Sequence, residues 1–256
     1  MRVTILGCGP SWGVPRIGND WGACDPGNPK NRRRRVSILV EDRSTTILVD
    51  TSPDLRAQLL DAGVRRLDAV LFTHAHADHL HGIDDLRGVN HAMKAAIPVY
   101  ATAETLADIE RRFAYVFVPL RSGREGHYYK PVLERRTIDG AFDVGRIHVV
   151  PFVQDHGFSK TLGFRFGGFA YSTDVVGLDD DAFAALAGID TWVVDCIRER
   201  PHVTHSHVDR TLAWIQRVRP RRAILTHMDE SLDYESLRRT LPAGVEPAYD
   251  GLVIEL

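Results

Sequence analysis

A cluster of metal-capable side chains stands out in the sequence. His74, His76, Asp78 and His79 form the pattern His-x-His-x-Asp-His directly after an apolar run at 67–72. On a segment that is still extended from a strand, His74 and His76 project to the same side, whereas Asp78 and His79 fall where the chain turns into a helix. The two pairs can therefore face two different ions, and imidazole and carboxylate suit zinc, manganese or iron. A helix start with solvated histidines is the alternative, but surface helices seldom need four such groups so close together.

Four ligands do not complete two coordination spheres, so further ligands must come from elsewhere in the chain. Three candidates each follow a strand-like apolar run: His156, Asp174 and His227. Loops at strand ends are where a rigid scaffold presents functional groups. These three residues are therefore the candidates for the missing ligands.

The elements that must position these residues read as strands alternating with helices. A hairpin is expected from 36–40 and 45–49, and a helix over 53–62 with Ser52 as its N-cap. Other strands are expected at 2–6, 67–72, 97–100, 146–152, 161–166, 169–172, 191–194, 223–226 and 251–255, other helices at 104–113, 179–186 and 208–218, and a polar loop at 123–130. Two sheet-rich halves without a Pro/Ser-rich linker predict two sheets packed in one domain, 1–256.

The composition is that of a globular chain. In 256 residues, 44% are hydrophobic, 26% are charged and the formal net charge is −2, which excludes disorder and gives no field that would attract nucleic acid or a membrane. The apolar runs are strand-sized, far below the roughly 18 residues of a membrane span. Cys8, Cys24 and Cys196 are too scattered for a disulfide framework. We therefore expect a cytoplasmic protein without a membrane partner.

The complete pattern resembles the metallo-β-lactamase superfamily, in which His-x-His-x-Asp-His is followed by a distant histidine, a bridging aspartate and a final histidine. All seven positions have a match in this chain. The resemblance implies a four-layer αββα sandwich, an α/β fold that agrees with the two sheet-rich halves. Carried over by position, it also implies that Asp174 bridges two ions, one held by His74, His76 and His156 and the other by Asp78, His79 and His227.

Flanking segments are similar to one branch of this superfamily, the phosphodiesterases that include the phosphoribosyl cyclic phosphodiesterase of phosphonate catabolism and its relative ribonuclease Z. The similar segments are GCGPSWGVP at 7–15, NRRRRVS at 31–37, HLHGIDDLR at 79–87 and YDG at 249–251. This branch often carries Cys-x-Cys-x-x-Cys for a structural zinc, whereas only Cys24 remains here, so we expect no structural zinc. The chain has no long Gly/Pro-rich insertion of the kind with which ribonuclease Z grips tRNA, so no large nucleic acid is expected as a partner.

The resemblance implies a metal-dependent hydrolase, and the branch favours a phosphodiesterase acting on a small cyclic or nucleotide-like phosphate ester. Two divalent ions about 3.5–4 Å apart, zinc or manganese with iron as a third candidate, would share a water and lower its pKa toward 7, so that it attacks as hydroxide. Asp78 counts among the catalytic residues as a ligand of one ion. Either His205 or His207 could protonate the leaving oxygen, and we favour His205 because it follows Thr204 as in the family pattern. Helix capping and surface exposure are the alternative for both histidines.

Other residues are candidates for contacting the substrate or positioning a ligand. Arg87 could pair with a phosphate, and Trp12 and Tyr249 could stack on a base or sugar, although a core role is as plausible for both aromatic residues. The arginine run 32–35 could also contact phosphate, but a solvated strand flank is the favoured interpretation. Asp50 either accepts the ring proton of a metal-bound histidine or caps a turn.

Two other functions stay open. One is thioester hydrolysis, as in glyoxalase II of the same superfamily, and the other is a non-catalytic nucleotide-binding or metal-binding protein on the same fold. Seven intact ligands argue against the second. Lactam hydrolysis is disfavoured because Asp174 stands where many lactamases have cysteine. A homodimer is compatible with the sequence, which specifies neither the substrate nor the native metal.

Overall fold

Two seven-stranded sheets form the centre of the protein. The computed structural model describes residues 1–120 and 128–256. The first sheet has the order β14-β1-β2-β3-β4-β5-β6 and the second β13-β12-β11-β10-β9-β8-β7. The strands of the first sheet are β14 (Val253–Glu255), β1 (Arg2–Gly7), β2 (Ser37–Asp42), β3 (Thr45–Val49), β4 (Ala69–Leu71), β5 (Ile97–Ala101) and β6 (Leu133–Thr137). Those of the second are β13 (Val245–Pro247), β12 (Arg222–Thr226), β11 (Thr191–Asp195), β10 (Phe169–Ser172), β9 (Lys160–Phe166), β8 (Ile147–Asp155) and β7 (Phe142–Val144).

Each sheet is antiparallel in one half and parallel in the other. In the first sheet, β14 to β3 pair antiparallel, including the expected hairpin of β2 and β3, and β3 to β6 pair parallel. In the second, β7 to β10 pair antiparallel and β10 to β13 pair parallel. The central strands β4 and β11 are buried along their whole length, which explains their continuous apolar sequences. Functional groups gather at the carboxyl ends of such parallel strands.

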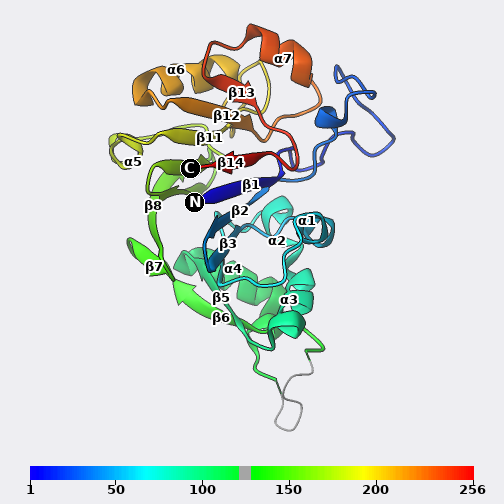
Figure 1. The fold of residues 1–256 in the computed structure, drawn as a ribbon, viewed down its shortest axis with the longest axis vertical. Coiled ribbons are helices and arrows are strands. Elements are labelled where there is room, and N and C mark those ends of the chain that lie inside the picture. Colours follow the sequence, from blue (N-terminus) through cyan, green and yellow to red (C-terminus); the bar gives the residue numbers. More distant parts are fainter. Residues whose placement is uncertain (121–127) are drawn as a thin grey trace.

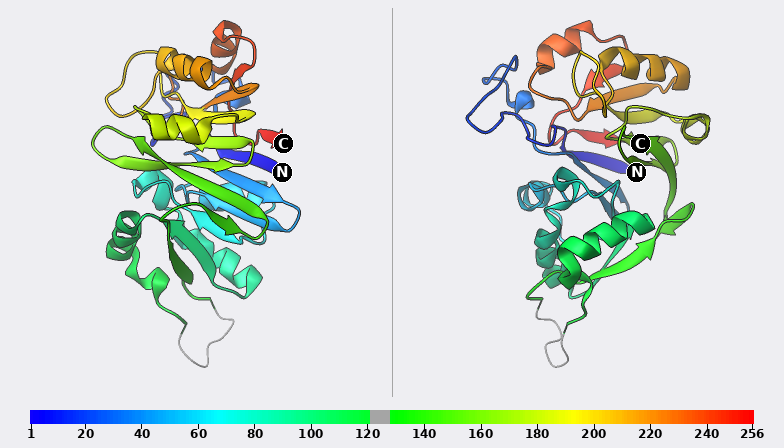
Figure 2. Two further views of the ribbon diagram at one scale, coloured as in Figure 1. Left: turned by 90° about the vertical axis from the view of Figure 1, so that its left-hand side faces the viewer. Right: turned by 180° about the vertical axis from the view of Figure 1, so that it is seen from behind.

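Helices cover the outer faces of both sheets, as Figures 1 and 2 show. One apolar core fills the space between the sheets and includes Val3, Ile38 and Phe164. A second core lies between the first sheet and its helices. The helices are α1 (Leu55–Asp61), α2 (Ala77–Leu80), α3 (Leu86–Met93) and α4 (Ala103–Phe113) on the first half, and α5 (Asp180–Leu186), α6 (Val208–Val218) and α7 (Tyr234–Thr240) on the second, with single 3-10 turns at Pro29–Asn31, Ile83–Asp85 and Ala114–Phe117. The predicted αββα architecture is confirmed.

Two local expectations differ from the structure or lie outside it. The helix expected at 53–62 is α1, which begins at Leu55 with Asp54 as its N-cap. The hydroxyl of Ser52 instead donates to the side chain of Gln58 and accepts from the Asp54 N–H, so Ser52 braces the turn before the helix. Most of the loop expected at 123–130 lies outside the described residues, because 121–127 are not described.

No helix in the described ranges 1–120 and 128–256 has the length and apolar character needed to cross a bilayer.

The segment between β1 and β2 forms a long loop beside α7, drawn in blue in Figure 1. Asp250 holds the base of this loop, because its carboxylate accepts the backbone N–H groups of both Cys8 (3.1 Å) and Arg34 (2.8 Å). Lys30, farther along the loop, donates to the Tyr234 hydroxyl at 3.2 Å. The loop is therefore fixed at its base and along its length.

Stability should depend on the ionisation of Asp250. Desolvation of the carboxyl raises the pKa of Asp250 from 3.8 to about 7. The folded state then keeps a proton that the unfolded state loses, so this group's contribution to stability is fully present below about pH 4 and falls as pH rises toward about 7. Urea unfolding at several pH values should show the stability of the wild type falling relative to Asp250→Asn between these limits and constant above them. A difference that does not change with pH would contradict this expectation.

Candidate metal centre

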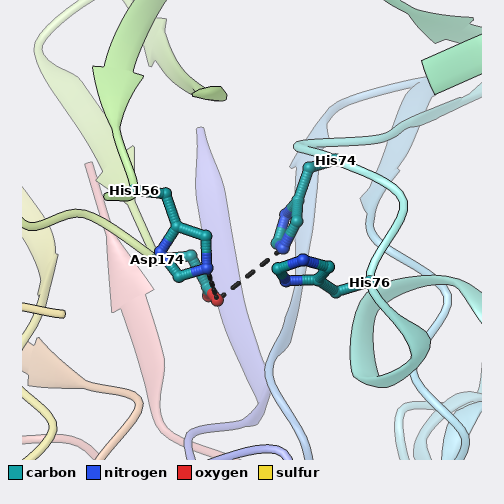
Figure 3. A group of neighbouring side chains, drawn as sticks. All are labelled: His74, His76, His156 and Asp174. Carbon is teal, nitrogen blue, oxygen red and sulfur yellow. Dashed lines mark ion pairs between the residues drawn. The ribbon is translucent and has the colours of Figure 1, made fainter. Parts of the chain in front are cut away.

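The seven candidate ligands come from four strand ends and meet at one place. His74 and His76 lie on the segment after β4, and Asp78 and His79 lie in α2. His156 stands in the turn between β8 and β9, Asp174 follows β10 and His227 follows β12. Figure 3 shows His74 and His76 approaching from one side, with His156 and Asp174 opposite them. The two sheets thus contribute ligands to a single centre.

Asp174 faces two sets of histidines, one with each carboxylate oxygen. Its Oδ2 lies 3.7 Å from Nε2 of His74 and 3.5 Å from Nε2 of His156. Its Oδ1 lies 3.0 Å from Nε2 of His79 and 3.3 Å from Nε2 of His227. The ligands form two groups, and within each group the donor atoms lie within 4.8 Å of one another. One group is His74, His76, His156 and Asp174, and the other is Asp78, His79, Asp174 and His227.

The donor atoms fit a cation chemically. The Nε2 atoms of His74, His79 and His227 are buried and have no hydrogen-bond partner among the described residues. An unpaired buried polar atom is costly, so such atoms indicate a partner that is not a protein group. Histidine nitrogens with carboxylate oxygens are a donor set for zinc, manganese or iron. The residues therefore suit divalent metal ions.

Backbone strain occurs at this centre. Asp174 has φ of 52° and His227 has φ of 62°, both in the left-handed region that non-glycine residues seldom adopt. Asp50, which contacts His79, has φ of 63°. Strained residues of this kind persist where the surrounding structure holds them, and they cluster at functional sites.

Hydrogen bonds fix three of the ligand rings. Nδ1 of His79 lies 2.7 Å from Oδ2 of Asp50, Nδ1 of His74 lies 2.9 Å from the Thr73 hydroxyl, and Nδ1 of His156 lies 2.7 Å from the Thr204 carbonyl oxygen. Asp50 also accepts the Thr73 N–H and hydroxyl. Of the two roles considered for Asp50, this geometry supports orientation of a ligand, and it leaves Nε2 of each ring for an ion.

At His74 and Asp174 the electrostatics favour the protonation states that metal ligands need, whereas at His79 burial is outweighed by Asp174 and Asp78, which raise the pKa of this ring well above its usual value. Burial, and secondarily the nearby His79, hold the pKa of His74 well below its usual value, so this imidazole is neutral at pH 7. Burial alone would raise the pKa of Asp174, but His227 and His79 outweigh it and hold that pKa well below its usual value. Asp174 is therefore a carboxylate.

A buried pair of residues, Asp195 and His205, adjoins the ligands. Nδ1 of His205 lies 3.1 Å from Oδ2 of Asp195, and its Nε2 lies 3.8 Å from Oδ2 of Asp174. Burial lowers the pKa of His205, but Asp195 and then Asp174 raise it to about 9. The ring is thus protonated at neutral pH and can donate a proton beside the centre. Donor atoms of Asp195, His205 and His227 also come within 4.8 Å of one another, but the hydrogen bond to Asp195 engages Nδ1 of His205.

Asp195 was missed in the sequence, although a signal for it was present. It is the last residue of β11 and follows a run expected to be a buried strand. The same rule that selected the other strand-end ligands would have selected it. Its Oδ2 also accepts the N–H groups of Val175 and Ser206, so it ties the loop of Asp174 to the loop of His205.

Comparison with known proteins agrees with this geometry. The family model described as the beta-lactamase superfamily domain matches residues 45–228, which is most of the chain and contains all seven candidate ligands. The chain belongs to the metallo-β-lactamase superfamily. The resemblance inferred from the seven-residue pattern is therefore confirmed.

The chain is similar to three proteins of known structure or assigned activity. A solved structure of a diphosphatase from the PhnP family has a TM-score of 0.91 and 33% sequence identity, covering 100% of this chain and 97% of that one. An octanoyltransferase of Porphyromonas gingivalis is 33% identical over 98% of this chain but 51% of its own length. A ribonuclease Z of Bradyrhizobium sp. is 30% identical over 54% of this chain and 46% of its own length. The chain spans about half the length of these two curated relatives.

The structure does not bring every candidate catalytic or substrate-binding residue to the seven candidate ligands. His207 is the N-cap residue of α6 and belongs to none of the ligand groups among the described residues. Arg87 lines a cavity of about 720 Å³ beside α1 and α3, whose described lining includes none of the seven ligands. Trp12 donates to Glu230 at 2.8 Å, and Tyr249 packs against Tyr234. Substrate contact by Arg87, Trp12 and Tyr249 stays a prediction.

The interpretation of 32–35 as a solvated flank is wrong for Arg33. Its side chain is 1% exposed, and its guanidinium donates to backbone carbonyls that follow the ligand His227. Sequence could not distinguish it from Arg32, which is exposed, because burial here depends on a segment almost 200 residues away. Cys24, the remaining cysteine of the zinc pattern, is buried with Sγ 3.8 Å from the Arg33 guanidinium.

Proposed function

We propose that this protein is a metal-dependent phosphodiesterase that hydrolyses a small cyclic or nucleotide-like phosphate ester at a two-ion centre. One observation carries the proposal: each carboxylate oxygen of Asp174 faces its own pair of histidines. The likeness over the full chain to a PhnP-family diphosphatase supports phosphorus as the reacting centre.

The residues divide into two sets of ligands. His74, His76 and His156 with Oδ2 of Asp174 would hold one ion, and Asp78, His79 and His227 with Oδ1 would hold the other. Two divalent ions, zinc or manganese with iron as a third candidate, supply a nucleophile from water at neutral pH and neutralise charge that develops on the phosphate. Asp50 keeps the His79 ring in place by accepting from its Nδ1.

His205 is the proposed general acid. Asp195 accepts from Nδ1 of His205, so Nε2 carries the proton that passes to the leaving oxygen. The raised pKa of about 9 keeps that proton in place at neutral pH. Because both Asp195 and Asp174 are carboxylates near this ring, the imidazolium is stabilised until a leaving group takes its proton.

Metal removal is the direct test. Purified protein should contain about two ions per chain and hydrolyse bis(p-nitrophenyl) phosphate. Dialysis against a chelator should abolish this hydrolysis, because the bound ions supply the nucleophile from water. Adding manganese or zinc should restore the rate. Elemental analysis and release of p-nitrophenol measure both quantities.

The same assay with a thioester substrate provides the contrast. Thioester turnover that greatly exceeds phosphodiester turnover would reassign the centre to a glyoxalase II-like reaction. Metal binding without turnover of either substrate after reconstitution would point to a binding protein.

A further inference from the structure

The segment that follows His227 encloses the buried guanidinium of Arg33. Arg33 donates to the carbonyl oxygens of Met228 at 3.5 Å, Asp229 at 2.8 Å and Leu232 at 2.6 Å. Converging carbonyl oxygens in a buried place need donors, and a guanidinium offers five N–H groups in a planar fork. The fold of 228–232 therefore depends on Arg33.

The position of the His227 ring depends on its backbone more than the positions of the other buried histidine rings do. The rings of His74, His79 and His156 are each fixed through Nδ1 by a hydrogen bond. Nδ1 of His227 has no such bond among the described residues, because its nearest carboxylate oxygen, on Asp195, is 3.9 Å away. The position of this ring is consequently decided by its backbone.

That backbone is strained and is held from outside. His227 has φ of 62°, and the next two residues are fixed by hydrogen bonds from Met228 N to the Cys8 carbonyl (3.0 Å) and from Asp229 N to the Ile197 carbonyl (2.9 Å). These bonds use the N–H groups, and Arg33 holds the carbonyl groups of the same two residues. Without Arg33, relaxation of the carbonyl groups would release the left-handed conformation at His227.

We propose that Arg33 is a positioning residue for His227 and thereby sets the affinity of the Asp78–His79–Asp174–His227 group for its ion. The inference rests on the two-ion centre of the proposed function. Groups that orient a metal ligand typically contribute about ten- to a hundred-fold in affinity. The effect should be confined to one of the two ions, because the hydrogen bonds that fix His74 and His156 run to Thr73 and Thr204 and not to this segment.

Cobalt(II) titration of the metal-free full chain tests the proposal, with calorimetry and visible absorption as readouts. The wild type should bind two ions. Arg33→Met should bind one ion as the wild type does and the other about ten- to a hundred-fold more weakly. Arg33→Lys, which keeps the charge but not the fork, should fall between them. Arg32→Met is the matched control, since Arg32 is exposed and adjacent, and it should bind both ions normally.

A double-mutant cycle separates positioning from a general loss of structure. If Arg33 acts through His227, adding Arg33→Met to His227→Ala should cause no further loss of cobalt affinity, whereas adding it to His156→Ala should. Equal weakening of both ions in Arg33→Lys, or unchanged binding in Arg33→Met, would overturn the proposal. A wild type that binds fewer than two ions would instead contradict the two-ion centre itself.

Discussion

Replacing Asp174 by alanine is expected to abolish nearly all phosphodiesterase activity and to remove the paired metal ions. Each oxygen of this carboxylate faces a different pair of histidines, and among the described residues no other side chain belongs to both ligand groups. A metal centre contributes several kcal/mol of transition-state stabilisation, and about 1.4 kcal/mol corresponds to a tenfold change in rate, so we expect a loss of about a thousand-fold or more. Turnover of bis(p-nitrophenyl) phosphate and metal content per chain measure the two effects.

Asp174→Asn tests whether charge or shape matters, because it preserves the shape and removes the anion. We expect it to be almost as inactive as the alanine variant. Asp143→Ala is the matched control: Asp143 also lies beside a histidine, His148 at 2.7 Å, but on the surface. It should retain full activity and both ions. Retention of the two ions by Asp174→Ala would remove this residue from the ligand set.

Replacing His205 by alanine is expected to lower kcat by about a hundred- to ten-thousand-fold for substrates with a poor leaving group, the usual contribution of a general acid. The loss should be much smaller for p-nitrophenyl esters, because p-nitrophenolate leaves without needing a proton. The comparison of alkyl with p-nitrophenyl esters therefore distinguishes proton donation from a structural role. An equal loss for both kinds of ester would contradict the assignment.

The pH dependence offers a second readout on the same pair. A general acid acts in its protonated form, so activity should be present below the pKa of His205, about 9, and should fall as pH rises through it. Asp195 is the largest influence that raises this pKa, so Asp195→Asn should move the alkaline limb to lower pH. His207→Ala should keep the wild-type limb, because the structure leaves His207 outside the ligand groups of the described residues.

The local pattern of the chain predicted two packed sheets and the candidate ligands, and the resemblance to a known family implied the four-layer αββα arrangement. Apolar runs ending in polar residues located the strands and placed His156, Asp174 and His227 at strand ends, where the structure has them. This worked because strand burial and side-chain alternation depend on neighbouring residues, which the sequence displays directly.

Only the tertiary structure decided which of several similar residues are buried beside the candidate ligands. His205 and His207 are two positions apart, yet one ring pairs with the buried Asp195 and the other begins a helix. Arg32 and Arg33 are adjacent, yet one is exposed and the other is enclosed by the segment after His227. The physical reason is that burial, pKa and hydrogen-bond partners at these residues come from segments distant in sequence, and those segments meet only when the two sheets pack.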